Sequence, residues 1–297
     1  MLCDAHCHFF SAGFLSALAR EMPEPPRDPA TELPARLGWD APGSDAVLAD
    51  RWLAELDRRG VSRAALIASV HGDEASVGTA VARHPARFVG YFFLNPCAAD
   101  AAERARRAFS PFGLRCLCLF PAMHRYPLED ERVSAVVSLA AEHRAAVFVH
   151  CGLLSVGARK KLGLPSRFDA RHGNPLGVAA LASQWPQVPF IIPHFGAGLF
   201  REALMALDLA ANVLLDTSSS NSWTRYIPGL RLEQVFRQAL DVGGASRLLF
   251  GTDSSFFPRG WQEGIYREQK RIVDMLGVSA PDAELIFGGN FERIFAR

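Results

Sequence analysis

Four histidines and one aspartate in this chain stand directly after short apolar runs. His6 and His8 close the first run, His150 and His194 close two later runs, and Asp253 follows the last one. Alternate residues of a strand point to the same side, so His6 and His8 should face one site together. Imidazole nitrogens and a carboxylate are ligands that suit Zn²⁺ and similar divalent metals. The pattern predicts a metal centre.

Each of these residues could also have a purely structural role. A single histidine at a strand end is usually an ordinary hydrogen-bonded residue, and Asp4 can either orient a ligand imidazole or be a buried strand residue. Chance placement is a poor explanation for the set, however, because four of the nine histidines of the chain lie at predicted strand ends. The metal hypothesis is therefore preferred for the group, while His194 remains open as either a ligand or a residue beside the metal.

The elements that would position these residues alternate along the chain. Apolar runs occupy residues 2–6, 63–68, 88–94, 114–120, 146–151, 189–193, 212–217 and 247–251. They are almost continuously apolar, as expected for parallel strands covered on both faces. Helical spacing of apolar residues follows at 45–59, 129–144, 175–184, 199–209, 232–240 and 263–276. This rhythm predicts an α/β fold, a single (β/α)₈ TIM barrel over residues 1–297. A doubly wound sheet would usually begin with a glycine-rich turn.

Two segments are longer than a barrel requires. Residues 11–43 are proline-rich and follow the first predicted strand, and residues 152–174 follow the fifth. We expect both to be long loops on the catalytic face of the barrel, where they would serve as lids or pocket walls. Surface padding without a function is the alternative.

The arrangement resembles a known group of enzymes. The order His-x-His, His, His, Asp is similar to that of the amidohydrolase superfamily. The C-terminal run IFGGNFER and the run FGTD before the last strand end resemble the amidohydrolase-related family, which includes aminocarboxymuconate semialdehyde decarboxylase and related lactonases. The resemblance covers essentially the whole chain and is specific for the family rather than for one substrate.

The resemblance implies a role for each residue of the motif. His6, His8 and His150 match metal ligands, and Asp253 matches an aspartate that contacts metal and water. His194 matches a histidine that, in single-metal members, holds or deprotonates the water.

The fourth predicted strand departs from the two-metal members of the superfamily. Those members supply a bridging modified lysine or a glutamate there, whereas this chain has Cys118. Without a bridging carboxylate we expect one divalent metal, with Zn²⁺ favoured. Cys118 as a thiolate ligand is an alternative to an ordinary buried cysteine.

A bound metal acidifies water and polarises carbonyl oxygens, and Asp253 or His194 would move the proton. The leading hypothesis is hydrolysis of an amide or lactone in a small, carboxylate-bearing substrate. Arg259 would bind the carboxylate and Trp261 would flank a ring. Residues 218–223 offer further polar groups. A non-oxidative decarboxylase of the same fold is the alternative, and a non-catalytic binding barrel is a third reading.

Composition excludes several other classes. The formal net charge is +1, with 32 basic and 31 acidic residues, which argues against a nucleic-acid partner. A nuclease of related fold would also want a carboxylate on the fourth strand. No apolar run approaches a membrane span, and the N-terminus has no signal-peptide pattern. The six cysteines form no Cys-x-x-Cys pair and indicate a reducing, cytoplasmic location. We expect a small-molecule substrate and allow for a homodimer.

Overall fold

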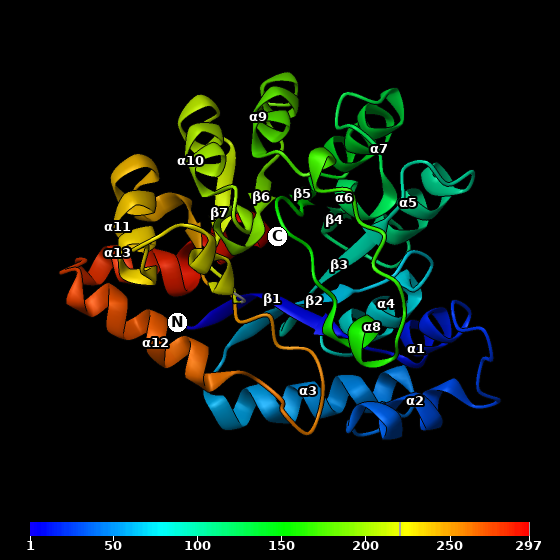
Figure 1. The fold of residues 1–297 in the computed structure, drawn as a ribbon. Helices are drawn as coiled ribbons and strands as arrows, with labels where there is room; N and C mark the ends of the chain where they lie inside the picture. Colours follow the sequence, from blue (N-terminus) through cyan, green and yellow to red (C-terminus); the bar gives the residue numbers. More distant parts are fainter. Residues whose placement is uncertain (220, 297) are drawn as a thin grey trace.

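Eight parallel strands form the centre of the protein in a computed structural model, which describes residues 1–219 and 221–296 (Figure 1). The strands are β1 (Cys3–Phe9), β2 (Arg63–Ala68), β3 (Phe88–Leu94), β4 (Cys116–Leu119), β5 (Ala146–Val149), β6 (Phe190–Ile192), β7 (Val213–Asp216) and β8 (Leu248–Leu249). Each pairs with the next in chain order. The edges of β1 and β8 are joined by backbone bonds such as Ala5 N to Phe250 O at 2.9 Å. The predicted (β/α)₈ barrel is confirmed.

Helices surround the barrel and follow the strands in sequence. They are α1 (Ala12–Ala19), α2 (Pro29–Leu37), α3 (Asp45–Arg59), α4 (Glu74–Arg83), α5 (Ala101–Phe109), α6 (Pro121–His124), α7 (Glu131–Glu142), α8 (Gly157–Lys161), α9 (Pro175–Gln184), α10 (Phe200–Leu209), α11 (Leu232–Gly243), α12 (Glu263–Met275), α13 (Ala280–Glu284) and α14 (Asn290–Phe295), with short helical turns between them. Within the described part of the chain, no helix has both the length and the apolar character that a membrane crossing requires.

Local signals in the sequence set the helix ends. Helix α3 begins after Ser44, whose hydroxyl accepts a hydrogen bond from the Val47 amide, and it ends at Gly60 with φ of 67°. A capping hydroxyl and a left-handed glycine are the usual start and stop of a helix. The buried face of α3 includes Trp52 and Leu56, so the helix packs that side onto the barrel.

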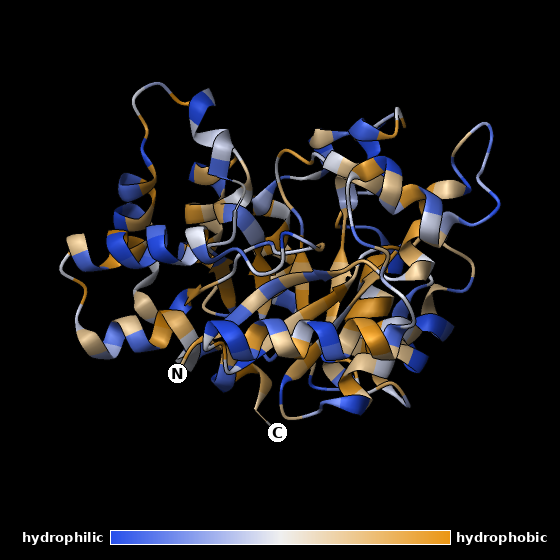
Figure 2. Cartoon of the chain, turned by 90° about the horizontal axis from the view of Figure 1, so that it is seen from below, coloured by the Kyte–Doolittle hydropathy of each residue, from blue (hydrophilic) through white to orange (hydrophobic). Residues whose placement is uncertain are grey.

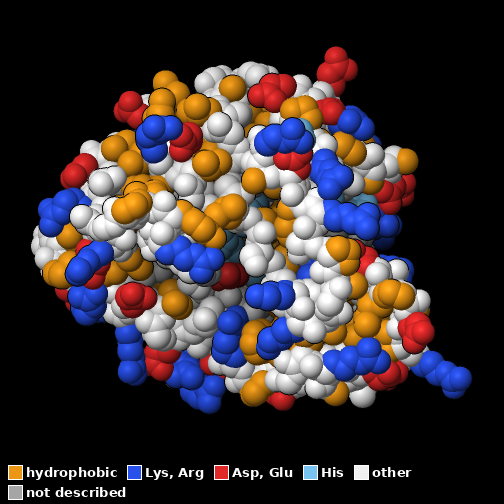
Figure 3. All heavy atoms as spheres, viewed as in Figure 1, with side chains coloured by type: hydrophobic (Ala, Val, Ile, Leu, Met, Phe, Trp, Pro, Cys, Tyr) orange, Lys and Arg blue, Asp and Glu red, His pale blue; other side chains and the backbone are white. Residues whose placement is uncertain are grey.

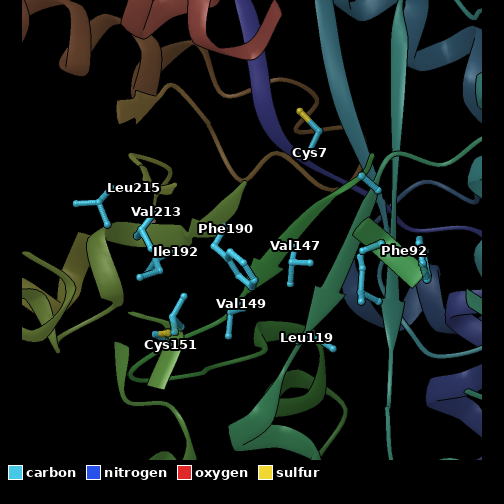
Figure 4. Close-up of a cluster of buried hydrophobic side chains, with 14 of the residues drawn as sticks. Cys7, Phe92, Leu119, Val147, Val149, Cys151, Phe190, Ile192, Val213 and Leu215 are labelled. Carbon is cyan, nitrogen blue, oxygen red and sulfur yellow. The ribbon is translucent and has the colours of Figure 1, made fainter. Parts of the chain in front are cut away.

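The core has two layers because the strands are buried on both faces. The outer layer lies between strands and helices, and Figure 4 shows part of it, including Val147, Phe190 and Leu215. The inner layer fills the barrel and includes Tyr91, Cys118 and Phe148. In Figure 2 the strands are mostly coloured as hydrophobic, and the helices around them contain both hydrophilic and hydrophobic residues. Both layers leave the carboxyl ends of the strands as the place for polar groups.

The two long segments are more ordered than expected. The segment after β1 was predicted to be a loop, but it contains α1 and α2, and the segment after β5 contains α8. Prolines obscured α2 in the sequence, since Pro29 occupies its first turn and Pro34 lies inside it. Apolar side chains of α1 and α2 pack with Ala158 and Leu164 of the second segment. The two segments therefore form one unit, which we call the cap.

Candidate metal and catalytic site

Strand β1 carries two of the predicted ligands. A bulge interrupts its pairing with β2 between Asp4 and Cys7. Bulges re-aim side chains at barrel rims. Cys7 and Phe9 belong to the outer core, while His6, within the bulge, and His8, beyond it, line the cavity at the barrel mouth. The expectation that both histidines face one site agrees with this geometry.

His6, His8 and Asp253 form a compact group. Each offers a ligand atom, and the three atoms lie within 4.8 Å of one another. Asp253 Oδ1 is 3.1 Å from His8 Nε2 and 3.6 Å from His6 Nε2. Asp253 is also in the left-handed backbone region, with φ of 58°, which places its carboxylate between the two rings at some conformational cost.

The other ring nitrogens of these histidines are already occupied. His6 Nδ1 lies 2.6 Å from Asp216 Oδ2, and His8 Nδ1 lies 2.7 Å from Ser69 Oγ. The carboxylate of Asp216 can only accept, so a neutral His6 carries its proton on Nδ1 and keeps a lone pair on Nε2. This is the arrangement typical of metal-binding histidines. The donor set therefore fits a divalent cation between Nε2 of the two histidines and the carboxylate of Asp253.

His194 lies beside this group and is held by the chain after β7. Its Nδ1 is 2.9 Å from Ser218 Oγ and 3.3 Å from the Ser218 carbonyl oxygen, while Ser218 Oγ is 3.1 Å from His6 Nδ1. The Ser218 carbonyl oxygen only accepts, which favours the tautomer of a neutral His194 that carries its proton on Nδ1. His194 also has positive φ, at 55°. Its Nε2 is therefore left unprotonated and available as a base.

His150, predicted as a ligand, is in the cavity but outside the compact group. It is buried, stacks on Phe120 at 5.2 Å between ring centres, and lies 5.3 Å from the ring of His194. Its Nδ1 is buried without a hydrogen-bond partner in the structure. A buried polar atom without a partner is rare and often marks a functional site. The ligand role of His150 stays a prediction.

Burial and charge set the protonation of the site. Burial raises the pKa of Asp253, but its hydrogen bond with His8 and the neighbouring imidazoles of His6 and His8 outweigh this and lower the pKa to about 2. Burial lowers the pKa of His194, and the neighbouring His6 lowers it further. At neutral pH the site thus holds an ionised Asp253 and a neutral His194.

Asp4 and Trp261 support the site from below. The Asp4 carboxylate accepts hydrogen bonds from the His6 amide at 2.9 Å, the Thr252 amide at 3.1 Å and the Trp261 indole at 2.7 Å. Of the two readings of Asp4, these contacts favour the buried strand residue. Trp261 was expected to flank the substrate, but it is buried at 2% exposure and bonded to Asp4. Tertiary packing thus places it in the wall that joins β1 to β8, and the expectation was wrong.

Above the histidines lies a cavity of about 420 Å³. Phe10 and Trp39 stack at 5.4 Å and Trp39 and Phe256 at 4.5 Å on one side, and Phe93 and Phe120 stack at 4.2 Å on another. Figure 3 shows a hollow at the centre of this face, with histidine and acidic side chains inside it and basic side chains at its rim. The cavity therefore has aromatic walls around a polar floor.

Arg259, predicted to bind a substrate carboxylate, is among the residues that line this cavity. Its guanidinium donates to Ser255 Oγ at 2.6 Å and to the Asp253 carbonyl oxygen at 3.3 Å, and it lies 4.4 Å above the ring of Phe256. The guanidinium has five donors, so these contacts leave others for a ligand. Arg259 is placed to bind an anionic group beside Asp253.

Sequence reasoning missed two supporting residues. Asp216 was counted as part of an apolar run, and Ser69 follows the second strand without drawing notice. The one available signal was a carboxylate inside a run that should be buried, because such a group needs a partner. Ser218 fell within the polar run 218–223 that was noted, and Ser220 of that run lies outside the described residues. Cys118, considered as a thiolate ligand, is buried inside the barrel.

The polar centre lies at the carboxyl ends of a (β/α)₈ barrel, the face where enzymes of this fold carry their active sites. An amidohydrolase family model matches residues 3–297. The chain therefore belongs to the amidohydrolase family. No curated protein matched the chain.

Solved structures with the same fold share little sequence with this chain. An amidohydrolase from Burkholderia multivorans with bound zinc has 16% identity and a TM-score of 0.68, covering 100% of this chain and 99% of that one. A mutant 5-carboxyvanillate decarboxylase from Novosphingobium aromaticivorans with bound manganese has 15% identity and a TM-score of 0.65, covering 100% and 97%. A probable 2-pyrone-4,6-dicarboxylic acid hydrolase from Acinetobacter baumannii with bound citric acid has 14% identity and a TM-score of 0.64, covering 100% of this chain and 99% of that one. These likenesses concern the fold.

Proposed function

We propose that the protein is a hydrolase that uses one divalent metal ion, with Zn²⁺ favoured, to cleave an amide or lactone in a small carboxylate-bearing substrate. The observation that carries the proposal is the pair of histidines whose Nδ1 atoms are engaged by Asp216 and Ser69. Their Nε2 atoms converge on the carboxylate of Asp253. A divalent ion held there would polarise the substrate carbonyl and make water more acidic.

His194 is the proposed general base. The hydrogen bond to the Ser218 carbonyl keeps its proton on Nδ1, so Nε2 is free to accept a proton from the attacking water. Asp253 is ionised and close to His8, so it would hold that water in place or take part in the proton transfer. His150 is proposed as the third histidine ligand, and its unpartnered Nδ1 is compatible with a contact that protein atoms do not supply.

The cavity supports a flat, acidic substrate. The aromatic rings line a cavity of about 420 Å³ that would hold a planar group, and Arg259 offers donors to a carboxylate at the edge of the polar centre. Guanidinium binding would fix the substrate so that its carbonyl faces His194 and the metal ligands.

Non-oxidative decarboxylation is the second candidate function. The aromatic walls favour it, because an aromatic acid would stack between them with its carboxylate toward the histidines. Loss of carbon dioxide would leave the bonding electron pair on the ring carbon, and His194 or Asp253, protonated beforehand by water, would deliver a proton to that carbon. The two functions use the same residues, so they differ only in the product.

Product analysis tests both proposals. The protein loaded with Zn²⁺ or Mn²⁺ would be incubated with carboxylated lactones, carboxylated anilides and hydroxybenzoic acids, and the products identified by mass spectrometry. A product heavier than the substrate by one water molecule, formed only while the metal is present, supports hydrolysis. Release of carbon dioxide supports the second candidate. His8→Ala should be inactive, while His143→Ala, which changes an exposed histidine of the surface, should retain activity. Full turnover after complete metal removal would contradict the metal proposal.

The location of the protein in the cell is also a proposal. All six cysteines are free thiols, and every one except Cys97 is buried. Free thiols persist in reducing compartments, which supports a cytoplasmic enzyme. A homodimer remains compatible with the proposed site, which is built from residues of one chain.

A further inference from the structure

The cap contributes a charged side chain to the cavity. Lys161, at the end of α8, lines the cavity together with Arg259, and Asp253 is the acidic residue among the lining side chains. The cavity therefore has two positively charged side chains, Lys161 and Arg259, and one carboxylate, Asp253, which the proposed metal ion would neutralise. This imbalance favours a ligand with more than one negative charge.

The backbone that carries Lys161 is held firmly. Ala158 and Leu164, on either side of it, are buried against apolar residues of α1 and α2. Arg159 makes a bidentate ion pair with Glu21, with distances of 2.6 and 2.7 Å, which ties α8 to the end of α1. The position of Lys161 is thus set by the fold, although its own side chain is largely exposed.

The ammonium group of Lys161 has capacity for a ligand. It lies 3.5 Å from the carbonyl oxygen of Leu37, a contact at the limit of a hydrogen bond. An ammonium group has three donors, so this contact leaves most of them for another partner. The neighbouring Lys160 is also exposed but does not line the cavity, which makes it a matched control.

We propose that Lys161 is a specificity-determining residue that binds a second carboxylate of the substrate, away from the one bound by Arg259. The enzyme would then select a planar dicarboxylate over the matching monocarboxylate. This inference rests on the proposed function for the orientation of the substrate, but the binding preference does not require turnover.

Binding measurements on the metal-loaded protein test the inference. Isophthalate and terephthalate serve as dicarboxylate probes and benzoate as the monocarboxylate, with dissociation constants from calorimetry at low salt. The parent protein should bind at least one dicarboxylate more tightly than benzoate. Lys161→Met should weaken that dicarboxylate about three- to tenfold, as expected for one partly exposed charged contact, and leave benzoate unchanged.

Lys160→Met is the control, because Lys160 is exposed but does not line the cavity. Lys160→Met should retain the full preference for the dicarboxylate. The inference is overturned if the parent protein shows no such preference, if Lys161→Met keeps it, or if the two lysine variants lose it equally. A preference that depends on Lys161 in a protein without hydrolytic or decarboxylating activity would support the inference and contradict the proposed function.

Discussion

Replacing Asp216 by asparagine should weaken metal binding without changing any ligand. Asp216 is fully buried and makes two short contacts, at 2.6 Å to His6 Nδ1 and 2.7 Å to the Ser218 amide. Both partners are donors, so both need an acceptor. An asparagine has one acceptor oxygen on its side chain. If that oxygen stays with Ser218, the amide NH₂ faces His6 and favours the tautomer whose proton is on Nε2, where the metal should bind.

The size of the effect follows from this mismatch. If the asparagine turns the other way, the NH₂ group meets the Ser218 amide, and a buried donor loses its partner. The first orientation therefore costs the metal-binding tautomer of His6, and the second costs one buried hydrogen bond. Removing such support from a ligand histidine typically lowers metal affinity about 10- to 100-fold, which corresponds to about 1.4 to 2.7 kcal/mol.

Competition with a chromogenic chelator would measure the Zn²⁺ affinity of Asp216→Asn and of the parent protein. Asp241→Asn, which changes an exposed carboxylate on α11, provides the control and should match the parent. Circular dichroism would establish that both variants are folded. An Asp216→Asn affinity within twofold of the parent, in a folded protein, would refute the argument that Asp216 sets the His6 tautomer.

Three further predictions concern His194, Asp253 and the buried carboxylate of Asp73. His194→Ala should keep close to parental metal content by elemental analysis but lose most activity; loss of metal in proportion to activity would make His194 a ligand. Asp253→Asn should lower turnover about 10²- to 10⁴-fold if Asp253 moves the proton, and activity within a few-fold of the parent would exclude an essential role. Burial raises the pKa of Asp73 from 3.8 to about 6 although Ser11 and Ser76 donate to it. The folded state therefore binds more protons between pH 4 and 6, so this group makes the protein less stable as pH rises through that window, by about 3 kcal/mol in full. Asp73→Asn should reduce this pH dependence in urea unfolding at pH 4 and 7.5, and an equal slope in both proteins would contradict it.

Much of the barrel could be predicted because its strands are buried on both faces and its helices on one. The predicted bounds of β2 and β3 are those of the structure. Strand β8 is shorter than predicted, since beyond Leu249 the chain departs from regular pairing with β7 and bonds to β1 instead. Apolar character does not encode that change of partner.

The five predicted centre residues all line one cavity, because each follows an apolar strand whose end must lie on the same face. Supporting residues could not be predicted in the same way. The contact of Asp216 with His6 depends on how β7 and β1 approach across the barrel, which sequence spacing does not determine. The burial of Trp261 likewise depends on Asp4, far away in the chain.

The cap has a consequence for the evolution of this protein. The proposed metal ligands and base stand on strand ends, whereas much of the outer cavity wall comes from segments inserted after β1 and β5. Changes in the inserted segments alter the shape and charge of the cavity without moving a ligand. A mutant library restricted to residues 11–43 and 152–174 should therefore shift substrate preference far more often than it destroys the chemistry. Exchange of these segments between homologues is a practical route to new specificities on an unchanged barrel.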